Sequence, residues 1–133
     1  MRLAFALLLL AAAPAAAAQM LPSGTWAGTL TDGDGDRHEV TAELERCDGG
    51  FTLVLAIDGR TATVPEDAPA TWQRGRLRFT TDRFRLPGTL LPRPVSCDLE
   101  ADELGTLRGL CAAGRGQLRL RLVPPVDGSM GCE

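Results

Sequence analysis

The sequence lacks several residue types on which catalytic and metal sites depend. Among its 133 residues there is no lysine, asparagine or tyrosine, and His38 is the only histidine. One imidazole cannot build a multi-histidine metal site or a relay of histidines. The sequence also has no G-x-S-x-G turn, no G-x-G-x-x-G and no phosphate-binding Gly-Lys loop. We therefore expect no enzyme, no bound metal and no cofactor. The alternative is a nucleophile paired with His38, which no motif favours.

An excess of positive charge is missing too. Without Arg2, 13 arginines stand against 17 aspartates and glutamates, which gives a formal charge of −4. Proteins that bind nucleic acid carry a basic surface, so we expect no nucleic-acid partner. The apolar run of residues 3–13 is too short to cross a bilayer, and no second run follows it. We therefore expect no transmembrane segment.

The amino terminus has the three parts of a secretory signal peptide. Met1 and Arg2 supply the positive start, residues 3–13 the apolar centre, and Ala16 and Ala18 the small residues at the cleavage-rule positions. No cysteine near this exit offers a lipid-anchor site. We predict a cleaved signal peptide over residues 1–18 and a single domain over residues 19–133, located in the periplasm or secreted.

The sequence does contain apolar residues at every second position, which is the period of a half-buried β-strand. No comparable helical pattern follows the apolar start. Asp58-Gly59 is a two-residue hairpin signal, and the three prolines of residues 86–94 predict a long surface loop. The alternating runs are residues 40–45, 51–57, 76–80, 95–100 and 117–122. This pattern predicts an all-β, antiparallel barrel of about eight short strands, because closure removes exposed strand edges.

The predicted inward positions are almost free of polar side chains. A barrel of about eight strands either fills its interior with side chains or holds one small ligand. If a cavity exists, it should accept an apolar guest through an open end near the 86–94 loop. The predicted core is Trp26, Leu30, Val40, Ala42, Leu44, Phe51, Leu53, Leu55, Ile57, Val64, Leu77, Phe79, Leu99, Leu118, Leu120 and Leu122.

The four cysteines form an even set in a chain that is expected to be exported, so two disulfides are expected. Cys97 and Cys111 each fall on an inward strand face. A hairpin centred near Leu104 would place them opposite one another, at a Cα separation of about 4.5–5.5 Å that a disulfide accepts. Cys47 falls on an outward face, where the carboxyl-terminal tail could bring Cys132. We predict the bonds Cys97–Cys111 and Cys47–Cys132, which contribute roughly 3 and 4.5 kcal/mol on the chain-entropy model.

Asp32, Asp34 and Asp36 alternate with glycines, and Glu43 follows eleven residues after Asp32. The spacing is similar to that of a calcium-binding loop with acids at positions 1, 3, 5 and 12. Position 6, however, is Arg37 where such loops need glycine, and Glu43 lies within an alternating strand. We interpret the segment as the polar tip of a hairpin, with weak calcium binding as the alternative.

Arginines gather in the second half of the chain. Residues 19–67 carry a net charge of −7 and residues 68–133 a net charge of +3. This cluster is either a surface for an anion or an acidic partner or a solvated exterior. Because the last strand of a barrel pairs with the first, we expect Arg119 and Arg121 to lie near Glu43 and Glu45, and we favour internal neutralisation. The cluster consists of Arg74, Arg76, Arg78, Arg83, Arg85 and Arg93.

Gly24 and Trp26 form a G-x-W motif within residues 23–30, at the start of the first predicted strand. A G-x-W here, followed by a meander of short strands, resembles the calycin group of barrels, which includes lipocalins and avidins. The resemblance implies that Trp26 plugs the closed end of the barrel and that Gly24 allows tight packing beneath it. The arginine of lipocalin final strands could correspond to Arg119 or Arg121. The biotin ligands of avidins have no counterparts, because tyrosine and asparagine are absent.

Small periplasmic inhibitors of metalloproteases are similar as well, being disulfide-bearing barrels with a G-x-W near the start. In that family the segment before the first strand enters the protease cleft, and residues 19–22 would be the matching segment here. Two functional hypotheses follow. The first is a non-catalytic exported binding protein that carries a small apolar ligand, and the alternative is an interaction protein such as a periplasmic protease inhibitor.

Overall fold

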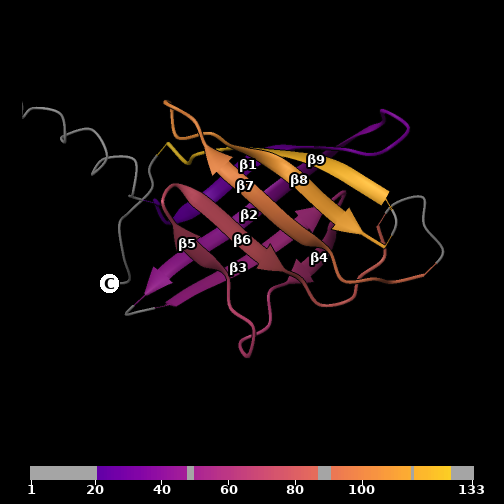
Figure 1. The fold of residues 1–133 in the computed structure, drawn as a ribbon, viewed down its shortest axis with the longest axis horizontal. Helices are drawn as coiled ribbons and strands as arrows, with labels where there is room; N and C mark the ends of the chain where they lie inside the picture. Colours follow the sequence, from indigo (N-terminus) through magenta and orange to yellow (C-terminus); the bar gives the residue numbers. More distant parts are fainter. Residues whose placement is uncertain (1–20, 48–49, 87–90, 115, 127–133) are drawn as a thin grey trace, which may run out of the picture.

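The computed structural model describes residues 21–47, 50–86, 91–114 and 116–126, so the predicted signal peptide, residues 1–18, lies outside the described residues. Within them the chain forms nine β-strands and no helix, all in one curled antiparallel sheet (Figure 1). The all-β antiparallel architecture is thus confirmed. The strands are β1 (Gly24–Thr31), β2 (Arg37–Cys47), β3 (Gly50–Ile57), β4 (Arg60–Thr63), β5 (Thr71–Gln73), β6 (Arg76–Thr80), β7 (Ser96–Ala101), β8 (Leu107–Ala113) and β9 (Gly116–Val123).

The strand order β4-β3-β2-β1-β9-β8-β7-β6-β5 is a meander whose middle joins the two ends of the chain. β1 pairs with β2 on one side and with β9 on the other, as expected for first and last strands. Every neighbouring pair of strands is antiparallel. Because the described sheet has nine strands, its two edge strands, β4 and β5, run in the same direction. No ladder joins these two edges among the described residues. Among the described residues the sheet is therefore a curled half-barrel, and the closed, calycin-like barrel stays a prediction.

The segment that follows β6 is tied to the β4 edge. The backbone N–H of Asp82 donates to the carbonyl oxygen of Thr63 at 2.8 Å. Nη1 of Arg60 donates to the carbonyl oxygen of Arg85 at 3.2 Å. Backbone groups of an irregular segment thus satisfy part of an edge that a closed barrel would pair with a strand.

The inward positions of the strands form one apolar core. Of the predicted core residues, all but two are less than a tenth exposed. The exceptions, Phe51 and Val64, are partly buried and pack against the rest. Each fully buried leucine contributes roughly 1.5–3 kcal/mol relative to exposure, so this core is the main source of stability.

Two tight turns have the positive φ values that two-residue hairpins require. Asp58 and Gly59, predicted as a hairpin signal, have φ angles of 48° and 82° and join β3 to β4. Arg74 and Gly75 have φ angles of 53° and 75° and join β5 to β6. Sequence alternation missed β5, because a strand of three residues is too short to show a period.

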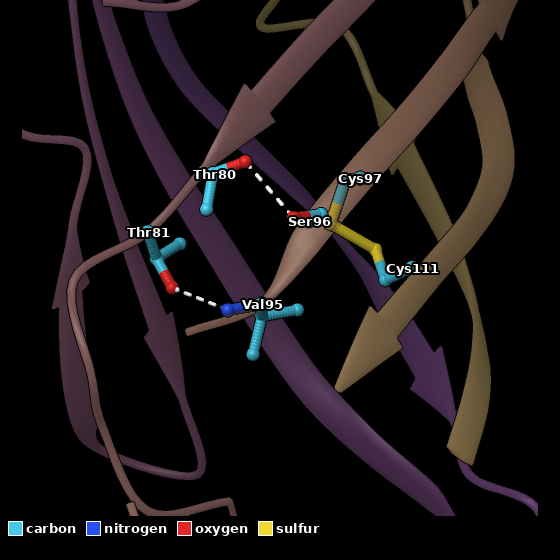
Figure 2. The surroundings of a disulfide bond; sticks show 6 residues. All are labelled: Thr80, Thr81, Val95, Ser96, Cys97 and Cys111. Carbon is cyan, nitrogen blue, oxygen red and sulfur yellow. Dashed lines mark hydrogen bonds between the residues drawn. A yellow bond between two sulfur atoms is a disulfide. The ribbon is translucent and has the colours of Figure 1, made fainter. Parts of the chain in front are cut away.

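The predicted Cys97–Cys111 disulfide is present (Figure 2). The two cysteines are register partners on β7 and β8, and their Cα atoms are 4.0 Å apart. Both side chains are buried, at 5% and 1% exposure, because both face the core. Cys132 and the side chain of Cys47 lie outside the described residues, so the second predicted bond stays a prediction.

Candidate functional site

A pocket of about 360 Å³ opens at one end of the half-barrel, where the β1–β2, β6–β7 and β8–β9 connections meet. Leu30 of β1 and Leu118 of β9 face it from the core. The β6–β7 connection adds Phe84 and Leu86, and the rim is polar. The pocket therefore combines an apolar interior with a charged mouth. The polar rim includes Asp32, Asp34, Asp36, His38, Arg93 and Gln117.

The β6–β7 connection is anchored at both of its ends. The Thr81 backbone N–H donates to the carbonyl oxygen of Val95 at 2.9 Å, and the Thr81 hydroxyl accepts the Val95 N–H at 3.1 Å. The latter bond lies beside the disulfide (Figure 2). Phe84 and Arg93 then form a backbone pair, with N–H to carbonyl oxygen distances of 3.2 and 3.1 Å. These bonds fix the course of the connection where it reaches the pocket.

The expectation of a surface loop over residues 86–94 is wrong at its first residue. Leu86 is 7% exposed, and Phe84 just before it is 9% exposed. Both side chains belong to the core cluster. The physical reason is that hydrogen bonds hold this segment against the β4 edge, so that its apolar side chains join the core. Leu91 is 63% exposed and also borders the pocket, whereas residues 87–90 lie outside the described residues.

The acidic segment is the tip of the β1–β2 hairpin, as we interpreted it. Oδ1 of Asp32 accepts the backbone N–H groups of Asp34 and Asp36 at 2.9 and 3.0 Å. The backbone N–H of Asp32 donates to the carbonyl oxygen of Asp36 at 2.9 Å. Asp32 therefore uses one carboxylate oxygen to order the loop, which leaves the other oxygen for His38.

His38 is held between two carboxylates. Its Nε2 lies 3.1 Å from Oδ2 of Asp32, and its Nδ1 lies 2.7 Å from Oδ2 of Asp58. The hydrogen bond with Asp32, supported by that with Asp58, raises the pKa of His38 above 6.5. In return the hydrogen bond with His38 lowers the pKa of Asp32 below 3.8. The imidazolium form satisfies both carboxylates, since each of its ring nitrogens then carries a proton to donate.

His38 links two segments of the structure in this arrangement. A general base or a metal ligand needs an imidazole nitrogen with a free lone pair, and both nitrogens of His38 are engaged. Asp58 also accepts the backbone N–H of Glu39 at 3.3 Å. Asp32, His38 and Asp58, which we call the Asp–His–Asp triad, thus link the β1–β2 tip to the β3–β4 turn beside the pocket mouth. Sequence reasoning missed this link, because it treated Asp58 only as a turn residue.

The calcium alternative receives no support from the geometry. Glu43 lies well inside β2, opposite Thr25 of β1, whose Oγ1 is 3.5 Å from its Oε1. It therefore cannot join the hairpin tip as a ligand. Over the described ranges, no group of three or more histidine, cysteine, aspartate or glutamate side chains is arranged to hold a metal ion.

Trp26 and Gly24 lie towards the other end of the sheet, where β1 begins. The Trp26 side chain is 1% exposed, and its Nε1–H donates to the carbonyl oxygen of Pro22 at 3.1 Å. Gly24 has a φ angle of 138°. Leu21, in the segment before β1, is also only 1% exposed. The described part of the segment before β1 therefore packs on the sheet instead of projecting from it.

The predicted arginine cluster is dispersed and partly neutralised. Arg76 lies 2.8 Å from Oδ1 of Asp98 and 3.5 Å from Glu100, and Arg78 lies 3.3 Å from Oδ2 of Asp98. The hydrogen bond from Arg76 lowers the pKa of Asp98. Arg93 borders the pocket instead. Internal neutralisation thus holds for two members of the cluster, although the carboxylates come from β7.

The expected approach of Arg119 and Arg121 to Glu43 and Glu45 is wrong. Across β1, Arg121 is level with Glu39, and Arg119 is level with Arg37. The first and last strands do pair, but their register places both arginines at least four residues along β2 from the predicted glutamates. Alternation fixes which face a residue occupies, whereas it does not fix the register between strands far apart in sequence.

No family model matches the chain, and neither a curated protein nor a solved structure shows a significant match to it. None of the described residues belongs to a helix of the length and apolar character that a membrane crossing requires.

Proposed function

We propose that this chain is a non-catalytic, exported binding protein that carries a small ligand with an apolar body in the end pocket. The observation that carries the proposal is the pocket itself, about 360 Å³ with Leu30, Phe84, Leu86 and Leu118 among its lining residues. Ligand sites are typically concave and mostly apolar, with a few polar groups that fix orientation, and they occur at barrel mouths. The calycin-like expectation for the fold points to the same kind of function.

The residues at the rim support binding over catalysis. His38 has both ring nitrogens committed to carboxylates, so its role at the mouth is to hold the β1–β2 tip in place. The protease-inhibitor alternative depends on residues 19–22 reaching into a partner. Within the described part of that segment, Leu21 is buried and the Pro22 carbonyl accepts the Trp26 N–H. These contacts favour the pocket over the amino-terminal segment as the functional site.

A pair of matched variants tests the proposal. Ala113 borders the pocket and is partly buried, whereas its neighbour Ala112 is exposed on the outer face. Ala113→Leu fills part of the cavity, and Ala112→Leu adds the same side chain to the opposite face. The probe is N-phenyl-1-naphthylamine, a neutral apolar fluorophore, titrated against the oxidised mature protein. We expect saturable binding that Ala113→Leu weakens about tenfold, the equivalent of roughly 1.4 kcal/mol, and that Ala112→Leu leaves unchanged.

Saturable binding that responds equally to both variants would place the fluorophore elsewhere and overturn the proposal, as would the absence of binding. Native mass spectrometry of protein from its own producer gives an independent readout. A bound mass that is lost on denaturation and extracts into organic solvent supports a carrier.

A further inference from the structure

Four arginines surround a shallow hollow on the outer face of β2, β1, β9 and β8. They are Arg37, Arg108, Arg119 and Arg121, and the hollow between them measures about 640 Å³. It lies on the convex side of the sheet, away from the end pocket, because these side chains alternate with the buried leucines of β9. Leu110 lies within it and is 48% exposed.

The strand register concentrates these charges. Arg121 is directly opposite Arg108 in the β8–β9 ladder, and Arg119 is opposite Leu110. Arg37 faces Arg119 across Thr31 of β1. Like charges on directly opposed strand positions destabilise a sheet, so the folded protein bears a cost at this face. The short threonine side chains leave the space between the guanidinium groups open.

Most of this charge is unpaired. Within the described ranges, Arg37, Arg119 and Arg121 have no ion pair or side-chain hydrogen bond. Arg108 approaches one carboxylate, with its Nε 3.7 Å from Oδ2 of Asp102. The contrast is with Arg76 on the same sheet, whose Nη1 lies 2.8 Å from Asp98.

Carboxylates limit the width of the basic area. Glu39 of β2 lies beyond Thr29 on one side, and Asp98 and Glu100 of β7 lie beyond β8 on the other. A long polyanion laid across the strands would meet these acids. The overall formal charge of −3 likewise opposes general attraction of polyanions. The free space therefore suits a compact anion that stays between the four arginines.

We propose that this face binds a compact ligand that carries two or more phosphate groups. Guanidinium groups pair with phosphate oxygens through two parallel N–H···O bonds, and closely spaced phosphates present enough charge to engage several arginines at once. Binding offsets the repulsion between Arg108 and Arg121, while Leu110 contacts the carbon skeleton of the ligand. This site is independent of the ligand carried in the end pocket.

The test is isothermal titration calorimetry of the oxidised mature protein with pyrophosphate and with inorganic phosphate. We expect pyrophosphate to bind and inorganic phosphate to bind more weakly. Arg121→Gln and Arg119→Gln should each weaken pyrophosphate binding about tenfold or more, because each removes charge-assisted hydrogen bonds to phosphate oxygens. The matched control is Arg78→Gln, which removes an exposed arginine of the same sheet that already has a carboxylate partner. Added salt should weaken binding throughout.

Thermal unfolding distinguishes a ligand-binding role of Arg121 from a purely structural one. Arg121→Gln should leave the melting temperature of the free protein unchanged or raise it, since one of two opposed charges is removed, and should abolish the stabilisation by pyrophosphate. Vesicles that contain diacylglycerol pyrophosphate, a lipid whose headgroup carries two linked phosphates, distinguish the sources. Arginine-dependent binding to them assigns the phosphates to a lipid headgroup, and binding of pyrophosphate alone assigns them to a soluble ligand. Equal loss of affinity in Arg78→Gln and Arg121→Gln, or no binding of pyrophosphate, overturns the proposal.

Discussion

At the end of the half-barrel where β1 begins, Trp26 and Leu21 are each 1% exposed, and the indole N–H of Trp26 donates to the carbonyl oxygen of Pro22. At the opposite end, polar groups surround an open pocket, and the described contacts there are hydrogen bonds among the hairpin tip, His38 and Asp58. One end is packed with buried apolar side chains, and the other carries the pocket and its polar rim; they are called the closed end and the open end below. If the pocket is the ligand site, as we propose, stability and recognition lie at opposite ends of one sheet.

Removal of the Trp26 side chain should disrupt the packing at the closed end and cause the largest loss of unfolding free energy. Trp26→Ala deletes a side chain that is fully buried in the core, for which the typical cost is about 3–5 kcal/mol of unfolding free energy. Leu104→Ala is the control, because Leu104 is 83% exposed. Urea unfolding of the oxidised protein measures both. A loss below about 1 kcal/mol in Trp26→Ala would show that the closed end does not carry the stability that its burial indicates.

Two glycines, one at each end of the sheet, should differ in how much an alanine substitution lowers the unfolding free energy, and this effect is smaller. Gly24, at the closed end, has a φ of 138°, whereas a Cβ on Gly33, in the hairpin tip at the open end, meets nothing within 4 Å. Gly24→Ala should cost about 1–3 kcal/mol, because alanine rarely adopts such a φ. Gly33→Ala should change the unfolding free energy by less than about 0.5 kcal/mol. Chemical denaturation of the two variants side by side is the measurement, and equal losses would contradict the assignment.

The smallest effect concerns pH and belongs to the open end alone. The folded-state pKa of His38 is raised above 6.5, so its contribution to stability is complete below that value and is lost as the pH rises through the raised pKa. The pKa of Asp32 is lowered below 3.8, so its contribution is present above that value and is lost as the pH falls through the lowered pKa. The Asp–His–Asp triad therefore stabilises the protein most between pH 3.8 and pH 6.5, the reference pKa values of the two groups.

His38→Gln tests this window. The melting temperature of the wild type should exceed that of the variant most at about pH 5 to 6, and the difference should shrink towards about pH 9. Thr41→Val, an exposed position in the middle of β2, serves as the control for a neutral change in the same strand. A difference between wild type and His38→Gln that stays constant with pH would show that the imidazolium does not bridge the two carboxylates.

Much of the fold was predictable, because short-range rules govern it. Alternation identifies the inward face of a strand without knowledge of its partners, which is why Leu118, Leu120 and Leu122 were placed correctly. The disulfide followed for a related reason, since a hairpin sets the register of its own two strands and therefore brings Cys97 opposite Cys111.

The pocket was less predictable, because it depends on contacts between segments far apart in the chain. Phe84 and Leu86 lie in a segment without a period, and their burial follows from hydrogen bonds that hold the segment against the β4 edge. The partnership of His38 with Asp58 spans 20 residues and requires the β2–β3 register. The available signal was that β2 and β3 form a hairpin, which can bring a histidine near the start of β2 level with an aspartate just after the end of β3.

The pairing of β1 with β9 has a consequence for how the chain reaches its folded state. If the chain is exported amino terminus first, β1 arrives early, and the strand that covers one of its edges, Gly116–Val123, arrives last. Until then the β1–β4 meander presents an unpaired edge on which another chain could add a strand. Contacts between distant parts of a chain also form slowly. The interval before β9 docks is therefore the stage of biogenesis at which misassembly competes most directly with folding.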